Sequence, residues 1–130
     1  MRAASQCFVC GAQNPTGLQL QFAPHGAGVQ AEFTPSRWHV GYEGVVHGGI
    51  LAALIDDAMA NIWFVRGEEA LTAKLEIRFR QVARPGERLL VSAEPTGRKG
   101  ALVTAHAEVR RADGAVIAEG TGFLAVQAVE

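Results

Sequence analysis

Surplus positive charge and long apolar runs are both missing from this 130-residue chain. It has 12 Lys and Arg against 13 Asp and Glu, for a formal net charge of -1. A chain without excess cations has little to hold a nucleic-acid backbone or an anionic membrane surface. Asp56 and Asp57 interrupt the longest apolar stretch, and the first residues lack the apolar run of a signal peptide. We therefore expect no nucleic-acid partner, no membrane association and a cytoplasmic location.

Cysteine is also scarce, with only Cys7 and Cys10, which form a C-x-x-C pair in a stretch rich in Gly, Asn and Pro. A zinc site would need two more ligands, and a redox dithiol would need a helix start. Neither is evident in the sequence, and the four histidines lack zinc-finger spacing. We expect no metal here, only a loop with two reduced, partly buried thiols.

The hydrophobic content of 48% is enough for one core, so we expect a single domain over residues 1–130, with 1–16 as an irregular lead-in. Alternating residues predict a hairpin of 18–22 with 29–33. They also predict a long strand from residue 71, with Leu71, Ala73 and Leu75 on its buried face and Thr72 on the other. Three further strands are expected within 88–95, 101–112 and 115–126. This order predicts an α+β domain in which an antiparallel sheet of five to six strands packs on one helix.

The helix is predicted within residues 45–65, "VVHGGILAALIDDAMANIWFV", which contain no Lys, Arg or Glu. One face is apolar, and the sheet should cover it. The opposite face carries Gly49, Ala52, Ala53, Asp56 and Ala60, small residues that permit close approach by another surface. We therefore expect the helix to be buried all round and the chain to form a homodimer or a dimer of dimers.

A buried carboxylate needs a partner, a proton or a chemical task, because burying an unpaired charge is costly. For Asp57 we expect a structural role, as a cap or in an ion pair. Asp56 differs because "HGG", residues 47–49, lies nine residues earlier at the probable start of the same helix. A helix start offers free backbone N–H groups that can receive a polarised carbonyl oxygen or an oxyanion.

These residues resemble a known family. "VVHGGILAALIDDAMA" is similar to the signature of the hotdog-fold acyl-CoA thioesterases, in the HGG branch that includes the phenylacetate-pathway enzymes. The stretches "CFVCGAQNPTGLQLQF", "LTAKLEIRFRQVARPGE" and "GRKG" resemble further family segments in the correct order. The combination includes a threonine sixteen residues after Asp56. The resemblance implies a hotdog fold, in which the sheet wraps around one central helix, and hydrolysis of an acyl-CoA to free acid and CoA, with no cofactor.

The resemblance also implies roles for individual residues. Asp56 would be the general base or nucleophile, Gly48 the backbone oxyanion donor, and His47 a neighbour that orients the thioester. Thr72 would hold the attacking water, contributed by the facing subunit or strand. The residues implied in substrate binding are Gly49 and, at the phosphates of CoA, Arg98 and Lys99. Several relatives have asparagine where this chain has Gly41.

Two alternatives stay open from the sequence. One is an acyl-thioester hydratase or dehydratase, although those enzymes resemble a different motif. The other is a non-catalytic acyl-CoA binding protein, although such proteins commonly carry an added domain, for which 130 residues leave no room. The sequence does not specify the acyl group, and it does not distinguish a dimer from a tetramer. It also leaves open whether Asp56 acts as base or nucleophile.

Overall fold

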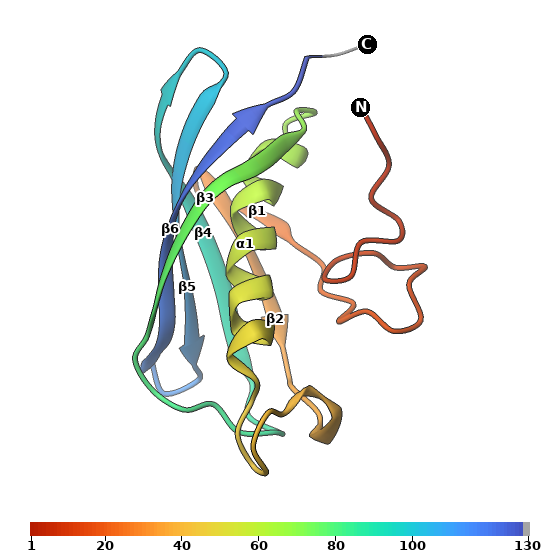
Figure 1. Cartoon of the computed structure of the whole chain (residues 1–130), viewed down its shortest axis with the longest axis vertical. Helices are drawn as coiled ribbons and strands as arrows, with labels where there is room; N and C mark the ends of the chain where they lie inside the picture. Colours follow the sequence, from red (N-terminus) through yellow and green to blue (C-terminus); the bar gives the residue numbers. More distant parts are fainter. Residues whose placement is uncertain (129–130) are drawn as a thin grey trace.

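A six-stranded antiparallel sheet curls around one long helix in the computed structural model, which describes residues 1–128 (Figure 1). The strands are β1 (Ala23–His25), β2 (Gly28–Phe33), β3 (Ala70–Phe79), β4 (Leu89–Lys99), β5 (Leu102–Arg111) and β6 (Val116–Val126). They are ordered β1-β2-β4-β5-β6-β3 across the sheet. The α+β architecture predicted from the sequence is confirmed, with six strands.

Helix α1 (Gly48–Phe64) lies on the concave face of the sheet and contacts β2 to β6 (Figure 1). Its sheet-facing side supplies much of the core, including Leu54, Ile55 and Ile62, which are fully buried. Two glycines of β6 allow this close packing. A Cβ at Gly120 would lie 2.9 Å from the Ile55 side chain, and one at Gly122 would lie 2.8 Å from Met59. Among the described residues, no helix is both long enough and apolar enough to cross a membrane.

The N-terminal segment differs from the predicted hairpin. Residues 18–22 are not a strand of the sheet, because the backbone N–H groups of Leu18 and Leu20 donate to the carbonyls of Phe8 and Val9. The strand that pairs with β2 is the shorter β1, which follows this segment. The irregular lead-in therefore extends to residue 22, and it packs beside α1 on the side away from the sheet (Figure 1).

Strand β3 corrects a second expectation. Its pairing with β6 shifts between Thr72 and Lys74, so that Ala73 is an extra residue in a β-bulge. A bulge reverses the alternation of side chains between the two faces of a strand. Before the bulge Ala70 and Thr72 face α1, and after it Leu75 and Ile77 do, while Leu71 is 48% exposed. The predicted buried face, Leu71 with Ala73 and Leu75, is therefore wrong for its first half.

Candidate active site

The first turn of α1 carries the predicted H-G-G motif as a helix cap. His47 is the N-cap residue, and its Nδ1 accepts a hydrogen bond of 2.8 Å from the Gly49 backbone N–H. Because Nδ1 is an acceptor, the proton of the neutral ring lies on Nε2, which is left as a donor. A Cβ at Gly49 would lie only 2.9 Å from Nδ1, so glycine is needed for this cap.

The backbone N–H of Gly48 is the donor that this cap leaves unused. Within residues 1–128 it has no hydrogen-bond partner, whereas the Gly49 N–H is occupied by His47. The positive end of the helix dipole adds to the attraction of this N–H for a partly negative oxygen. A role of Gly49 in substrate binding would consequently rest on its missing side chain rather than on a free donor.

Two further residues contact the cap, and the first of them, Phe79, is not among the site residues predicted from the sequence. Phe79, from β3, lies against Gly48, since a Cβ on that glycine would be 3.5 Å from its ring. Gly41 packs against the His47 ring, because a Cβ at position 41 would lie 3.3 Å from the ring Cδ2. Only the fold shows these contacts, because the sequence places Phe79 merely among the alternating apolar residues of its strand.

Asp56 and Thr72, sixteen residues apart in sequence, meet in the structure. The Thr72 hydroxyl donates a hydrogen bond of 2.5 Å to Asp56 Oδ1. The bulge at Ala73 makes this contact possible, because it turns Thr72 toward the helix. The strand of the same chain supplies this threonine. A hydrogen bond to a carboxylate is among the stronger ones in proteins, so it fixes the orientation of the Asp56 side chain.

Asp57 has entirely different neighbours. Its Oδ2 accepts a hydrogen bond of 3.0 Å from the Asn61 amide, and its Oδ1 accepts one of 3.4 Å from the Cys7 thiol. Burial raises the pKa of the Asp57 carboxyl, hydrogen bonds from Cys10 and Cys7 oppose the rise, and the nearby negative charge of Asp56 adds to it. The sequence predicts a structural role for Asp57, and these contacts to the N-terminal segment are of that kind, but with neutral partners instead of the expected cation.

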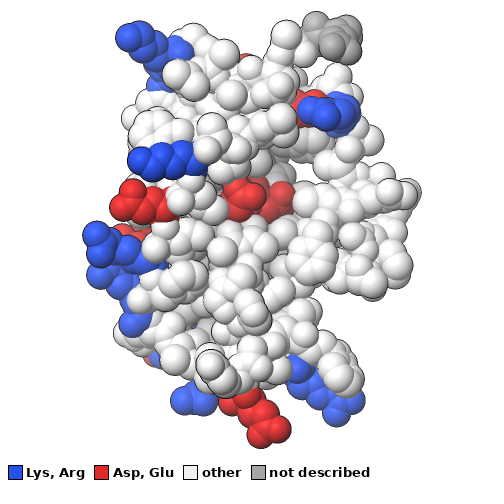
Figure 2. Space-filling model, viewed as in Figure 1, with Lys and Arg blue, Asp and Glu red and all other residues white. Residues whose placement is uncertain are grey.

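Both aspartates are half-buried within one chain. The N-terminal segment covers α1 at Asp57, whereas the small residues around Asp56, Ala52, Ala53 and Ala60, remain partly exposed. The expected burial of the helix on all sides is therefore incomplete in a single chain. In the view that shows α1 beside the N-terminal segment, acidic side chains gather in a depression near the middle of a mostly uncharged face (Figure 2).

Arg98 and Lys99 do not lie in a turn, as the sequence suggests, but are the last two residues of β4. The Arg98 guanidinium donates two hydrogen bonds of 2.9 Å to the Glu68 carboxylate, and a third to the Gly100 carbonyl. This guanidinium lowers the pKa of Glu68. Lys99 is exposed and has no partner within the described part of the chain. Of the two residues predicted to bind the phosphates of CoA, only Lys99 has a side chain that is not already bound within the described part of the chain.

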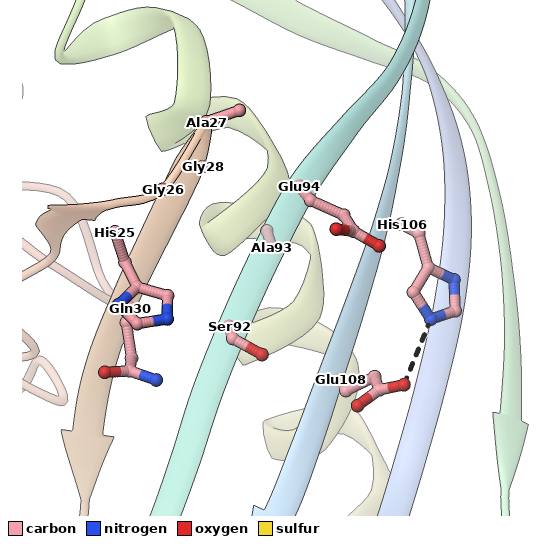
Figure 3. A pocket seen from close by; sticks show the side chains of 10 residues that line it. All are labelled: His25, Gly26, Ala27, Gly28, Gln30, Ser92, Ala93, Glu94, His106 and Glu108. Carbon is pink, nitrogen blue, oxygen red and sulfur yellow. Dashed lines mark hydrogen bonds and ion pairs between the residues drawn. The ribbon is translucent and has the colours of Figure 1, made fainter.

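A polar hollow of about 400 Å³ lies away from all these residues, on the outer face of the sheet (Figure 3). Its walls carry Gln30, Ser92, Glu94 and a contact of 3.4 Å between His106 and Glu108. These residues alternate along β2, β4 and β5 with the buried ones that face α1. The hollow contains none of the predicted site residues, so we do not identify it with the candidate active site.

Comparison with known proteins identifies the family. The sequence profile of the thioesterase superfamily matches residues 43–118, more than half of the chain, and the chain belongs to this superfamily. A curated protein of Deinococcus radiodurans, named as a presumed esterase, is 38% identical over 70 residues. Those residues are 54% of this chain and 47% of the relative, so the match spans about half of the relative's length.

Solved structures agree on the hotdog fold of this superfamily. A thioesterase superfamily protein superposes with a TM-score of 0.82 and 25% identity, over 88% of this chain and 60% of the other. The PaaI protein of the Escherichia coli phenylacetic acid degradation operon gives 0.79 and 18%, over 85% and 81%. A Streptococcus mutans protein bound to acetyl-CoA gives 0.78 and 17%, over 84% and 89%. At these last two identities the likeness shows the fold alone.

Proposed function

We propose that this chain hydrolyses an acyl-CoA thioester to a free acid and CoA. The observation that carries the proposal is the 2.5 Å hydrogen bond from Thr72 to Asp56, on a helix whose first turn has a free N–H at Gly48. Superfamily membership supports the reaction type. The acetyl-CoA bound to the Streptococcus mutans protein supports the class of ligand.

The roles of the residues follow from what each atom can do. Gly48 N–H and His47 Nε2–H are donors for the thioester oxygen as negative charge develops on it. Asp56 removes a proton from water or attacks the carbonyl carbon itself, and Thr72 holds the carboxylate and the water. The C–S bond then breaks, and the CoA thiolate leaves and takes up the proton that came from water. If Asp56 attacks directly, water hydrolyses the resulting anhydride and restores the carboxylate. Lys99 meets the phosphates of CoA, and Arg98, whose guanidinium is paired with Glu68, contributes less.

The two parts of this machinery cannot serve the same thioester within one chain. Asp56 is eight residues beyond Gly48 on α1, which is about 12 Å at a rise of 1.5 Å per residue. We therefore propose that Asp56 acts with the H-G-G cap of a partner subunit, so that a homodimer, alone or within a tetramer, contains two shared sites. The partner would also remove solvent from Asp56, which strengthens a carboxylate as base or nucleophile.

The outer edge of β3 supports this assembly. Within residues 1–128, β3 pairs only with β6, which leaves its other edge open. Leu71 and Phe79 on this strand are 48% and 55% exposed. A long edge strand with exposed apolar residues is suited to pairing with another strand. Light scattering at micromolar concentration should give at least twice the 13.8 kDa mass of one chain, and a monomer would contradict the shared site.

The reaction is tested by measuring free thiol release from a panel of acyl-CoA substrates, with Asp56→Asn as the control. Hydrolysis liberates CoA, whereas hydration or dehydration of the acyl group leaves the thioester intact, and a carrier binds without turnover. Thiol release that depends on Asp56 supports the proposal. Binding of acyl-CoA without thiol release, across aromatic, short and medium acyl chains, would overturn it in favour of a binding protein.

A further inference from the structure

The second cluster of reactive side chains, outside the proposed active site, joins the N-terminal segment to α1. The sulfur atoms of Cys7 and Cys10 and a carboxylate oxygen of Asp57 all lie within 4.8 Å of one another. Asn61 closes the cluster, with its amide 3.8 Å from Cys10 Sγ and 3.0 Å from Asp57 Oδ2. The sequence shows only the two cysteines, and the fold brings in a third potential ligand from fifty residues away.

The donor set and its spacing suit one type of ion. Two sulfurs and one carboxylate oxygen match the ligands that zinc takes in tetrahedral sites. With bonds of about 2.3 Å to sulfur and 2.0 Å to oxygen, tetrahedral ligands are separated by roughly 3.5 Å. The observed separation of Cys7 Sγ from Asp57 Oδ1 is 3.4 Å. This pair of ligands therefore already has the spacing of a zinc site, and Cys10 Sγ lies within 4.8 Å of both.

The turn that holds the two cysteines is tightly built. The Gly11 N–H donates to the Cys7 carbonyl at 2.8 Å, which closes the C-x-x-C turn. A Cβ at position 11 would lie 2.3 Å from the Cys7 backbone nitrogen, so any other residue would open the turn. Val9, between the cysteines, is buried in the core and anchors the segment. Both thiols are free and half-buried, as predicted from the sequence.

The surroundings of the Asp57 carboxylate also suit a cation. Asp57 is half-buried, and within residues 1–128 its side-chain hydrogen bonds come from neutral groups, the Cys7 thiol and the Asn61 amide. A carboxylate removed from water among neutral groups is stabilised by a cation placed beside it. A cavity of about 270 Å³, lined by the two cysteines, Asp57 and Asn61, reaches the cluster and gives an ion a path of entry.

We propose that Cys7, Cys10 and Asp57 bind a zinc ion, which fastens the N-terminal segment to α1 beside Asp56. Binding releases the two thiol protons to solvent and leaves two thiolates and one carboxylate on the metal, with water at the fourth position on the cavity side. The ion adds a positive charge directly to the Asp57 carboxylate, whose side-chain hydrogen bonds within residues 1–128 come from neutral groups. Its role is structural, and no step of thioester hydrolysis passes through it.

The experiment is a zinc titration of the full chain, reduced and freed of metal, against a chromophoric chelator. We expect one zinc per chain in the wild type. Asp57→Asn keeps the size of the side chain but should weaken binding at least about 100-fold, the upper end of what loss of a supporting group costs. Asp56→Asn is the matched control, one residue away and outside the cluster, and should bind zinc as the wild type does.

The double variant Cys7→Ser with Cys10→Ser should lose tight zinc binding. Cobalt added to the wild type gives a second readout, a thiolate-to-cobalt charge-transfer band. This measurement uses only the wild type, so it does not depend on whether a variant folds. Equal affinity of Asp57→Asn and wild type would overturn the three-ligand site. So would absence of the cobalt band, or mass spectrometry showing a Cys7–Cys10 disulfide in a protein that binds no zinc after reduction. None of these readouts depends on catalytic turnover.

Discussion

Asp56 and Asp57 are neighbours on one helix, yet the fold gives them opposite environments. Asp56 faces β3, where the Thr72 hydroxyl donates a hydrogen bond to its carboxylate, and the residue remains partly exposed. Asp57 faces the N-terminal segment, where two thiols and an amide enclose it. Residue type and helical position are almost the same for the two. The comparison shows that the chemistry of a carboxylate is decided by the segments that pack on its side of the helix.

The largest expected difference between the two aspartates is in turnover. Asp56→Asn keeps the shape of the side chain but removes the base or nucleophile, so kcat should fall by about 100-fold or more. Asp57→Asn should lower kcat by less than about 10-fold, because Asp57 is outside the proposed reaction path. Steady-state thiol release, with circular dichroism as a check of folding, makes the comparison. Wild-type turnover of Asp56→Asn on every substrate would exclude its catalytic role.

A mixed dimer sharpens the assignment of Asp56 to a shared site. Neither an Asp56→Asn homodimer nor a Gly48→Pro homodimer should retain substantial activity, because each lacks one half of both sites. A dimer with one subunit of each kind can place both lesions in one site, leaving the other whole. Co-expressed subunits with different affinity tags should therefore recover about half of wild-type activity. Failure of a well-folded mixed dimer to recover any would show that each chain works alone.

The second largest effect is expected at Thr72, which has no counterpart beside Asp57. Thr72→Ala removes the hydrogen bond to Asp56 and should reduce kcat about 10-fold, which corresponds to the lower end of the roughly 1.5–3 kcal/mol of a hydrogen bond to a charged group. Thr72→Ser retains the hydroxyl and should keep most of the activity. If both variants lose activity equally, the methyl group and not the hydroxyl is what matters.

A smaller effect is expected where CoA is bound. Replacing Lys99 with alanine should raise KM for an acyl-CoA several-fold and leave kcat nearly unchanged, because this contact is far from the reacting carbon. Arg98→Ala should do less to KM, since its guanidinium is engaged by Glu68. A short thioester without the nucleotide is the control substrate. Equal losses on both substrates would remove these residues from CoA binding.

The smallest effect concerns pH and stability in the presence of a chelator. Burial raises the pKa of Asp57 above its ordinary value of 3.8, so the folded state binds this proton more tightly than the unfolded chain. The free energy of unfolding contributed by this group is therefore greatest below pH 3.8 and declines as pH rises through the folded pKa. Asn cannot titrate. As pH rises, urea unfolding should show the free energy of unfolding of the wild type falling relative to that of Asp57→Asn. A rise of the wild type relative to the variant would contradict the raised pKa.

Sequence patterns were sufficient for the helix, for five of the six strands, for the α+β architecture and for the family. The start of α1 at the H-G-G motif is local, because it depends on a cap and on glycines near one another in sequence. The hairpin turn before residue 115 is also local, with the Ala115 N–H donating to Asp113. Such features involve short-range hydrogen bonds, which residue types and spacing report directly.

The tertiary structure alone decided what depends on contacts between distant segments. The bulge at Ala73 exists only as a mismatch between β3 and β6, so a strict two-residue pattern placed Thr72 on the wrong face. Residues 18–22 alternate like a strand, but the N–H groups of Leu18 and Leu20 donate to carbonyls of the N-terminal segment. Asp57 meets Cys7 and Cys10 because that segment folds back over α1. A one-dimensional pattern records the periodicity of each segment, whereas its partners are chosen by the packing of the whole chain.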